Sequence, residues 1–510
     1  MKRKTLTTAV LAGLTGVAGM VSVSNAVNLN PDGLGQVLLY PYYSARGDND
    51  TLISIVNTTD NAKSVKVRFL EALNSREVLD FNLYMSAYDV WVAAITATDA
   101  GGGQILVPDS SCTVPYFFGN DTLAAGETEA DRLGQQDFLS FGYAGDGGPQ
   151  EIERTASGYI EVIEMGTLVD LTNASATAAT HVLTDAGDGS GELPRPANCA
   201  QLVGAWTSVG GTDGYWVADQ DVDHEPPSGG LFGAASIINV PSGTMFSYTA
   251  DAIDGFVQGR ILHTDPGSIF PNLNSGDDVS NVFIGGVVDT RQWTDPVEAV
   301  SATVLYNTVM NEYVVDPSTN AQSEWVVNFP TKRFYVDAPF AIDTPPVAPF
   351  TSTWGPDGAC EVVDFEFWDR EEAPANPVII GPIVSPPPPD GPGPGDFELC
   401  YEANVIRFAD GASSPDATEI LAEPRFTTFP VLDSGFTDGW VRFAFDNATR
   451  PGSDPSTGSL VEYIGLPTIG FWVNTYSNGT LGGGTVLANY GGTFKHRGSR
   501  DLQAFVPPSP

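Results

Sequence analysis

The chain has 510 residues, with 63 Asp and Glu, 23 Lys and Arg and 4 His, which gives a formal net charge of −40. A chain of this charge repels phosphate backbones and anionic lipid headgroups, so nucleic-acid binding and electrostatic membrane binding are excluded. Gly and Pro together make up about 18% of the chain, but 42% of residues are hydrophobic and 10% are aromatic. A disordered chain has far fewer apolar residues, and we therefore expect a folded, loop-rich protein.

The N-terminus has the features of an export signal. Residues 2–4 are Lys-Arg-Lys, residues 5–23 are apolar and small, and Ser24-Asn25-Ala26 fits a small-x-small cleavage site. We expect residues 1–26 to be a signal peptide, with a mature start at Val27. Its removal takes away three positive charges and no negative ones, so the mature charge is −43. The expected location is outside the cytoplasm, extracellular or on the cell surface, with the periplasm as an alternative.

No later stretch of about 18 apolar residues follows, so no integral membrane span is expected after cleavage.

The chain contains four cysteines, and none of them has C-x-x-C spacing: Cys112, Cys199, Cys360 and Cys400. An even number in an exported chain indicates two disulfides, for which three pairings are possible. We favour Cys112–Cys199 and Cys360–Cys400, because nearest-neighbour pairing closes the shorter loops.

The first part of the mature chain has the clearest strand pattern. In residues 64–69, apolar Val65, Val67 and Phe69 alternate with Lys66 and Arg68, so we expect the first three to face a core and the two cations to face water. Strands are predicted at 36–43, 52–56, 64–69, 78–85 and 90–95. Short strands at roughly ten-residue spacing with polar turns are typical of a β-sandwich.

Loop-rich and strand-rich stretches then alternate along the chain. Residues 97–150 and 173–230 have the composition of loops, whereas 157–165 reads as a strand and 234–240 and 244–249 read as a strand pair. We place an N-terminal β-sandwich-like domain with loop insertions at 27–230, and a second mainly-β domain at 231–510.

The second domain contains the one helix that we expect. Asp295-Pro296-Val297-Glu298 has the form of a capping box, and apolar residues follow at helical spacing, so a helix is predicted at 296–310. Residues 324–336 read as a strand with a bend at Pro330. Further strands are expected at 400–408, 439–445 and 470–475.

The Pro- and Gly-rich residues 385–396 have the composition of a linker between domains. A Cys360–Cys400 disulfide would instead tie both ends of this segment together. We prefer an exposed loop within one domain.

One acidic loop is the best candidate for a metal site. Asp219, Asp221, Asp223 and Glu225 alternate along a short segment, and carboxylates that converge in this way suit calcium. The segment lacks the pattern of an EF-hand, and a solvated acidic loop is the alternative. Aromatic residues lie just upstream and suggest contacts to a sugar: Trp206, Tyr215 and Trp216.

Catalytic motifs are not evident. The chain has no G-x-S-x-G, H-E-x-x-H, Walker A or G-x-G-x-x-G pattern, and its four histidines lie far apart and read as surface residues. Glycosidase carboxylates are conceivable at Asp364, Glu366 and Asp369 beside Phe365, Phe367 and Trp368. We favour a strand with the acids outward and the aromatic residues inward.

Two short motifs allow more than one interpretation. Arg46-Gly47-Asp48 matches a cell-adhesion tripeptide, but the same residues are ordinary in a turn. The basic cluster 495–500 could meet an acidic face of the same molecule or of a neighbouring one, or could form a local ion-paired end.

Residues 52–91 resemble the immunoglobulin-like modules of bacterial surface proteins. The resemblance rests on Ser54-Ile-Val-Asn57-Thr-Thr, on Val65-Lys-Val-Arg-Phe69 and on Leu79-Asp-Phe81. Gly465-Leu-Pro467-Thr-Ile-Gly470-Phe and Asn489-Tyr-Gly-Gly are similar to segments of uncharacterised exported bacterial proteins. These resemblances imply an architecture and no activity.

The expected fold is mainly β, with immunoglobulin-like β-sandwich units, long loops and a single short helix near 296–310. The favoured function is that of a non-enzymatic exported surface or extracellular protein, structural or adhesive, such as a filament or matrix subunit. Its partners would be copies of itself or other surface proteins. The alternative is a secreted carbohydrate-binding or carbohydrate-active protein that uses acidic and aromatic residues on a polysaccharide.

Overall fold

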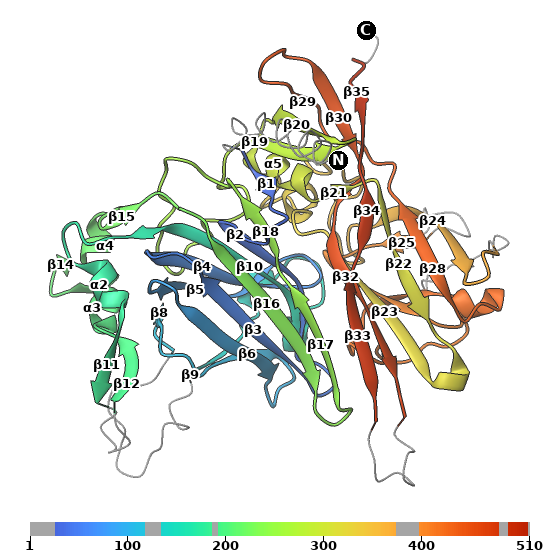
Figure 1. Cartoon of the computed structure of the whole chain (residues 1–510), viewed down its shortest axis with the longest axis horizontal. Coiled ribbons are helices and arrows are strands. Elements are labelled where there is room, and N and C mark those ends of the chain that lie inside the picture. Colours follow the sequence, from blue (N-terminus) through green and yellow to red (C-terminus); the bar gives the residue numbers. More distant parts are fainter. Residues whose placement is uncertain (1–25, 118–133, 186–191, 374–396, 479–487, 508–510) are drawn as a thin grey trace, which may run out of the picture.

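The computed structural model describes residues 26–117, 134–185, 192–373, 397–478 and 488–507. The expected signal peptide, except for Ala26, and the Pro-rich segment 385–396 lie outside these ranges. The described chain is mainly β, and Figure 1 shows an N-terminal unit beside a C-terminal unit. No helix in the described ranges is long and apolar enough to cross a membrane.

The N-terminal unit consists of two facing sheets. The first sheet has the order β1-β18-β2-β10-β4-β5-β8, with β15 also paired to β10. Its strands are β1 Asn28–Leu29, β2 Val37–Ser44, β4 Ala62–Glu71, β5 Glu77–Met85, β8 Cys112–Val114, β10 Ser157–Leu168, β15 His224–Glu225 and β18 Asp251–Asp254. The second sheet has the order β17-β16-β3-β6-β7-β9. Its strands are β3 Asn49–Asn57, β6 Val90–Ala97, β7 Gly103–Val107, β9 Gly134–Asp137, β16 Leu231–Asn239 and β17 Thr244–Thr249.

The apolar faces of these two sheets pack against each other. Val65, Val67 and Phe69 of β4 are fully buried, as their alternation predicts, and they share one core with Ile55 of β3 and Trp91 of β6. Residues 52–91 therefore contribute strands to both sheets, because β3 pairs with β6 whereas β4 pairs with β5.

The boundary between the units lies later than residues 230 and 231, where the sequence placed it. β16 pairs along its whole length with β3, β17 pairs with β16, and β18 pairs with β2. Residues 231–254 therefore belong to the N-terminal sheets. The sequence could not reveal this, because these partners lie about 180 residues earlier in the chain.

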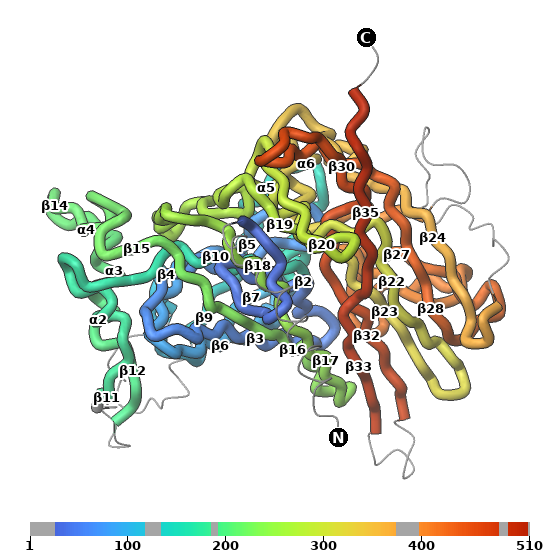
Figure 2. Tube along the Cα trace, turned by 45° about the horizontal axis from the view of Figure 1, so that its top comes forward, coloured from blue at the N-terminus to red at the C-terminus, as the bar shows by residue number. Residues whose placement is uncertain are grey.

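A lobe projects from the side of the N-terminal unit, and both ribbon views show it (Figures 1 and 2). It contains α2 Ser175–Ala179, α3 Cys199–Ala205 and α4 Tyr215–Ala218, with the hairpins β11 His181–Asp185/β12 Glu192–Pro196 and β13 Ser208–Val209/β14 Thr212–Asp213. The lobe has a small core of its own, and the disulfide Cys112–Cys199 ties it to β8.

The C-terminal unit contains three five-stranded sheets and one strand pair. The first sheet is β19 Val279–Ile284, β20 Val287–Gln292, β29 Gly452–Ser453, β30 Leu460–Ile464 and β35 Asp501–Ala504. The second is β22 Thr308–Val314, β24 Glu361–Asp369, β25 Phe397–Leu399, β28 Asp438–Ala444 and β34 Arg497–Ser499. The third is β23 Ala321–Asn328, β26 Ala403–Phe408, β27 Phe426–Phe429, β32 Ile469–Tyr476 and β33 Tyr490–Lys495, and the pair is β21 Leu305–Tyr306 and β31 Leu466–Pro467. In the described ranges, 3₁₀ turns cover Phe141–Tyr143 and Ile152–Ala156 in the N-terminal unit and Pro317–Thr319 and Val431–Ser434 in the C-terminal unit.

The sheet that contains β23, β26 and β32 joins the two units. Trp325 of β23 packs toward β28, with its ring 5.2 Å from that of Phe443. Its neighbour Val326 points to the opposite face and belongs to the core of the N-terminal unit, as does Phe471 of β32. β23 and β32 are therefore buried on both faces.

The helix expected at 296–310 is shorter, and it is not the only one. α5 covers Pro296–Thr303 and begins as predicted, with the backbone N–H of Asp295 donating to Glu298 Oε2 at 3.0 Å. Residues 305–314 instead form β21 and β22, because pairing with β31 and β28 overrides the helical spacing. Four further short helices lie in the described ranges, namely α2, α3, α4 and α6 Arg333–Val336. α6 also replaces the second half of the strand expected at 324–336.

The disulfides join Cys112 to Cys199 and Cys360 to Cys400, the same pairing that the sequence favours. Both bridges fit an oxidising compartment outside the cytoplasm. β24 pairs with β25 next to the second bridge, with Glu361 opposite Leu399. The residues on either side of the Pro-rich segment therefore belong to one sheet, as the loop interpretation requires.

Two glycines provide a test of this packing. A Cβ at Gly158 in β10 would lie 2.0 Å from the carbonyl oxygen of Leu70, within a strand that is paired on both sides. We expect Gly158→Ala to lower the free energy of unfolding by about 3 kcal/mol. Gly204→Ala in α3 meets nothing within 4 Å, and we expect it to stabilise by about 0.5 kcal/mol. Urea unfolding of both variants measures these changes, and equal effects would contradict the strand register.

Candidate functional site

The acidic loop 219–225 holds the side lobe together. Asp223 is buried, with a positive φ of 58°, and its carboxylate accepts hydrogen bonds from the backbone N–H of Thr172 at 2.6 Å and of Asn173 at 2.9 Å. The hydroxyl of Ser175 donates a further bond at 2.7 Å. Burial alone would raise the pKa of Asp223, but these hydrogen bonds outweigh it and the pKa is lowered. Asp223 thus acts as an acceptor that fastens the chain at 172–175.

The other three acids of this loop do not converge with Asp223. Asp219, Asp221 and Glu225 are exposed, and Asp219 accepts a hydrogen bond from the backbone N–H of Asp221 at 3.2 Å. Among the described residues, no three carboxylates or histidines bring their ligand atoms within 4.8 Å of one another. The calcium site expected at this loop therefore has no preformed set of ligands in the described structure.

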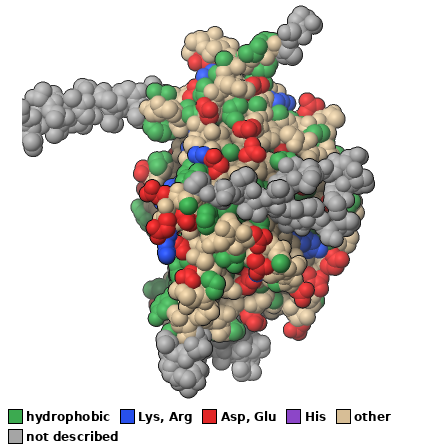
Figure 3. Space-filling view, turned by 90° about the vertical axis from the view of Figure 1, so that its right-hand side faces the viewer, with side chains coloured by type: hydrophobic (Ala, Val, Ile, Leu, Met, Phe, Trp, Pro, Cys, Tyr) green, Lys and Arg blue, Asp and Glu red, His purple; other side chains and the backbone are tan. Residues whose placement is uncertain are grey.

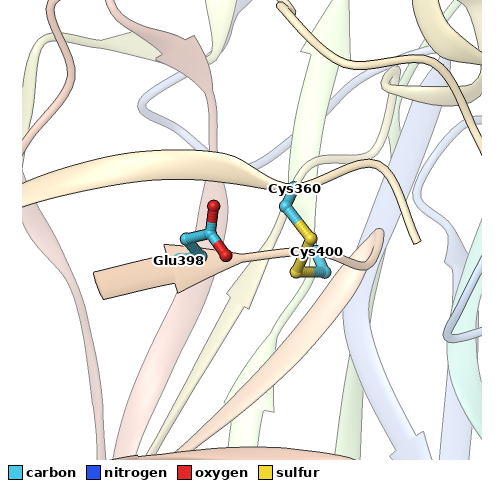
Figure 4. Close-up of side chains that lie close together, drawn as sticks. All are labelled: Cys360, Glu398 and Cys400. Atoms are coloured by element: carbon cyan, nitrogen blue, oxygen red, sulfur yellow. A yellow bond between two sulfur atoms is a disulfide. The ribbon is translucent and has the colours of Figure 1, made fainter. Parts of the chain in front are cut away.

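One other group has the spacing of metal ligands, but its chemistry is different. The sulfur atoms of Cys360 and Cys400 lie beside the carboxylate of Glu398, as Figure 4 shows. The two sulfur atoms are joined in a disulfide. They therefore offer no thiolate, which is the form that binds metals.

Of the aromatic residues expected to contact a sugar, Trp216 lies in the lobe's interior, and Trp206 and Tyr215 are half-buried. Trp216 is fully buried and stacks on Tyr84 of β5, with ring centroids 5.0 Å apart. Trp206 and Tyr215 pack against Trp216 at 5.6 and 5.1 Å. Trp216 therefore has no open face for a sugar ring, and the cluster anchors the lobe to the first sheet.

Two histidines complete this cluster, although the sequence placed them on the surface. His224 and His263 are buried and stacked, with ring centroids 3.8 Å apart. Trp206 Nε1–H donates to the hydroxyl of Tyr84 at 2.8 Å, and that hydroxyl lies 2.9 Å from His263 Nε2. The carbonyl oxygen of Gln220 can only accept from His263 Nδ1, so Nε2 of the neutral ring carries no proton and accepts from the hydroxyl of Tyr84.

This chain of hydrogen bonds determines the tautomer of each histidine. His263 accepts at Nε2 and donates from Nδ1 to the carbonyl oxygen of Gln220 at 2.7 Å. His224 donates from Nδ1 to the carbonyl oxygen of Val222 at 3.0 Å, and its Nε2 has no hydrogen-bond partner. Burial lowers the pKa of His224 to about 4, and burial together with His224 lowers the pKa of His263 well below its usual value. Both rings are therefore neutral at pH 7.

A second polar cluster covers the outer face of the first sheet. Lys66 and Arg68, which were expected to face water, are buried. Lys66 Nζ donates to Asp80 at 3.0 Å and to two backbone carbonyl oxygens of residues 265 and 266. The segment that follows β18 therefore covers this face. Strand alternation shows that a face is polar, but it does not show whether other parts of the chain cover it.

Ion pairs run along this covered face. Lys63 pairs with Glu164 at 2.7 Å, and neither side chain is exposed. Arg68 bridges Glu77 and Glu161 at 2.8 and 2.7 Å. Arg154 holds both carboxylate oxygens of Glu71, at 2.8 and 2.9 Å. We call these residues the buried ion-pair layer. Its charges satisfy one another and are closed to a ligand.

The short motifs are also occupied within the molecule. Arg46 donates to the backbone carbonyl oxygen of Glu153 and to Ser157 Oγ, so it is not free to act as an adhesion tripeptide. In the basic cluster, Lys495 pairs with Asp251 of the N-terminal unit, and Arg500 donates to the carbonyl oxygen of Thr303 at 2.7 Å. This cluster therefore meets residues of the same molecule.

The remaining candidate is the outer face of the six-stranded sheet. Along β3, β6, β16 and β17, buried residues alternate with exposed or half-buried ones that point away from the core. The uncharged outward positions, with those of β7, form what we call the neutral face, which is bordered by the outward Asp50 of β3, opposite Ile238, and by Asp137 of β9, opposite Gln104. Its members are Leu52, Ser54, Val56, Val90, Val92, Ala94, Thr96, Gln104, Leu106, Phe232, Ala234, Ser236, Ile238, Met245, Ser247 and Thr249.

No position of the neutral face carries a charge. The strand register places its members side by side, with Ser54 opposite both Val92 and Ala234. Met245 is 58% exposed, Val90 49% and Phe232 40%. Strands spaced by about 4.8 Å that rise about 3.3 Å per residue give a face of about 20 Å by 20 Å. A surface of this kind can bind another uncharged surface.

The sequence pattern had indicated β3, β6, β16 and β17, whereas β7 lies in a stretch that reads as loop. Nothing in the pattern singled out the neutral face, because the face is assembled from segments that lie up to about 200 residues apart. A scan of protein-family models, a search of curated proteins and a search of solved structures find no match to this chain. The functional argument therefore depends on these surfaces.

The buried histidines predict a loss of stability in acid. His224 has a folded pKa near 4 and an unfolded pKa near 6.5. The contribution of the neutral His224 ring to the free energy of unfolding is complete above pH 6.5. It decreases as the pH falls, and about 3 kcal/mol of it is lost at pH 4. We expect His224→Gln to flatten the unfolding free energy between pH 6.5 and 4, measured by urea titration. His181→Gln, a change at a half-exposed position, serves as the control. An unchanged pH slope in His224→Gln would contradict the burial of this ring.

Proposed function

We propose that this chain is a non-enzymatic exported protein of the cell surface or extracellular space, with a structural or adhesive role. Its copies meet through the neutral face and build a filament or matrix layer. We also propose that the N-terminal sheets are immunoglobulin-like, an architecture that modules of bacterial surface proteins have. The two disulfides and the large negative charge support an extracellular location.

The single observation that carries this proposal is the absence of charge on the described neutral face. The mature chain has a net charge of −43, so two copies repel each other over most of their surfaces. In Figure 3, which views the C-terminal unit from the right-hand side of Figure 1, acidic side chains are spread over the described surface and basic ones are few. Contact through a charge-free face adds no close like-charge pairs.

The cations of the chain strengthen this argument. Three of the four lysines of the mature chain, Lys63, Lys66 and Lys332, are buried, and the fourth pairs with Asp251. The lysines are thus not free to bind the acidic surface of another copy, and exposed cations such as Arg260 and Arg370 already pair with acids of the same chain. Apolar contact is the source of affinity that we propose between copies.

The size of the face predicts the strength of the contact. About 400 Å² per copy is half of the roughly 800 Å² that each partner contributes to a standard stable interface. We therefore expect reversible association that depends on concentration. Salt should strengthen it, because a Debye length of about 8 Å at 0.15 M screens the repulsion between copies. An interface built on ion pairs would weaken in salt instead.

A charge placed on the neutral face tests the proposal. We expect Val92→Glu to abolish self-association of the mature protein, measured by sedimentation and by electron microscopy of concentrated samples. Val209→Glu adds the same charge at a 74% exposed position of the side lobe and should leave association unchanged.

Three results would reject this role for the neutral face: a wild-type protein that stays monomeric at high concentration and high salt, association that weakens in salt, or equal association of the two variants.

A further inference from the structure

A pair of tryptophans lies on the outside of the second sheet of the C-terminal unit. Trp368 of β24 and Trp440 of β28 are directly opposite in the strand register. Their rings are stacked, with centroids 4.2 Å apart and planes 13° from parallel. Trp440 is 37% exposed and Trp368 is half-buried. The alternation in β24 was expected to bury Trp368, but only Phe365 and Phe367 turn inward, toward Phe429.

The tryptophan pair is not part of the core of its sheet. Val441 and Phe443 of β28 point inward and are fully buried, whereas Trp440 and Arg442 point outward. Because this indole pair is partly exposed on an outer face, it buries less apolar surface than a core residue and contributes less to the stability of the fold. It has the character of a contact surface.

Neighbouring side chains hold the pair in place and surround it with polar groups. The guanidinium of Arg442 lies over the ring of Trp368, 5.6 Å from its centroid, and pairs with Glu366 in the adjacent strand. Glu312 of β22 is opposite Trp440 on its other side and is exposed. Polar groups therefore border the stacked rings on two sides: Glu366 and Arg442 lie in the next cross-strand row, and Glu312 lies beyond Trp440 in the same row.

This combination suits a sugar ring. The C–H groups on one side of a pyranose form an apolar face that packs on an indole, and its equatorial hydroxyl groups point outward to hydrogen-bond partners. Carboxylates accept hydrogen bonds from these hydroxyl groups, and a guanidinium donates to them. Stacked rings with fixed side chains lose little entropy on binding.

The charge of the chain selects among sugar polymers. A net charge of −43, with Glu366 and Glu312 at the site itself, repels uronic-acid and sulfated polysaccharides. We propose that Trp368 and Trp440 form a binding platform for a neutral polysaccharide, in which the sugar packs on the 37% exposed Trp440, Trp368 supports that ring from behind, and Glu366, Arg442 and Glu312 contact the hydroxyl groups. The platform lies in the C-terminal unit, on a sheet that does not contain the neutral face, so it does not depend on self-association.

The test measures retention of the mature protein on cellulose, chitin, xylan and mannan, with alginate as an anionic comparison. We expect binding to at least one neutral polymer and none to alginate. Trp440→Ala should weaken this binding by about tenfold, the loss of one aromatic stacking contact, and Trp368→Ala, which removes the ring that supports Trp440, should also weaken it. Trp440→Phe should retain most of it. Phe141→Ala, a change at a 72% exposed aromatic residue of the N-terminal unit, is the matched control and should bind as the wild type does.

Melting curves show whether each variant is folded. Quenching of tryptophan fluorescence by a soluble oligosaccharide of the polymer that binds gives a second measure of binding. The proposal is overturned if the wild type binds none of the four neutral polymers, if it binds alginate more strongly, or if both tryptophan variants bind as Phe141→Ala does. It is also overturned if Trp440→Ala changes only the sedimentation of the protein, because the platform would then be a contact between copies. Val92→Glu should not alter polysaccharide binding, so the two proposals fail separately.

Discussion

The structure depends on how a chain with three times as many acids as bases distributes its few cations. Lys63, Lys66, Arg68 and Arg154 lie in the buried ion-pair layer, where each is matched by a carboxylate at 2.7 to 3.0 Å. Such pairs add little net stability, because desolvation offsets their attraction, but losing one partner leaves a buried charge and costs about 3–5 kcal/mol. The layer therefore specifies which segments cover the first sheet.

This distribution of charge shapes the outside of the molecule. Because most lysines are inside, the exterior repels other acidic polymers and other copies of the chain. Contacts with partners are left to two kinds of surface, the neutral face of the N-terminal unit and the tryptophan platform of the C-terminal unit. The first has no charge, and the second combines aromatic rings with polar groups that recognise hydroxyl groups.

Local patterns predicted much of the fold and little of the candidate sites. The alternation of residues 64–69, the turn between β16 and β17 and the capping box at Asp295 depend on neighbours in the chain, and all three are present in the structure. Trp216, His224 and His263 show the opposite case. Residues 219–225 read as an acidic loop, with calcium binding and a solvated loop as the two interpretations, but packing against Tyr84 and His263 buries Trp216 and His224 inside a lobe while Asp219, Asp221 and Glu225 stay exposed.

The sequence by itself determined the mainly-β class, the nearest-neighbour pairing of the cysteines and the excess of negative charge, because composition and short spacings carry these properties. Only the tertiary structure decided which polar face is covered, which tryptophans are buried and which lie outside, and where a charge-free surface forms. Each of these depends on the register between strands that are far apart in the chain. A shift of one residue in that register would exchange the two faces of a strand.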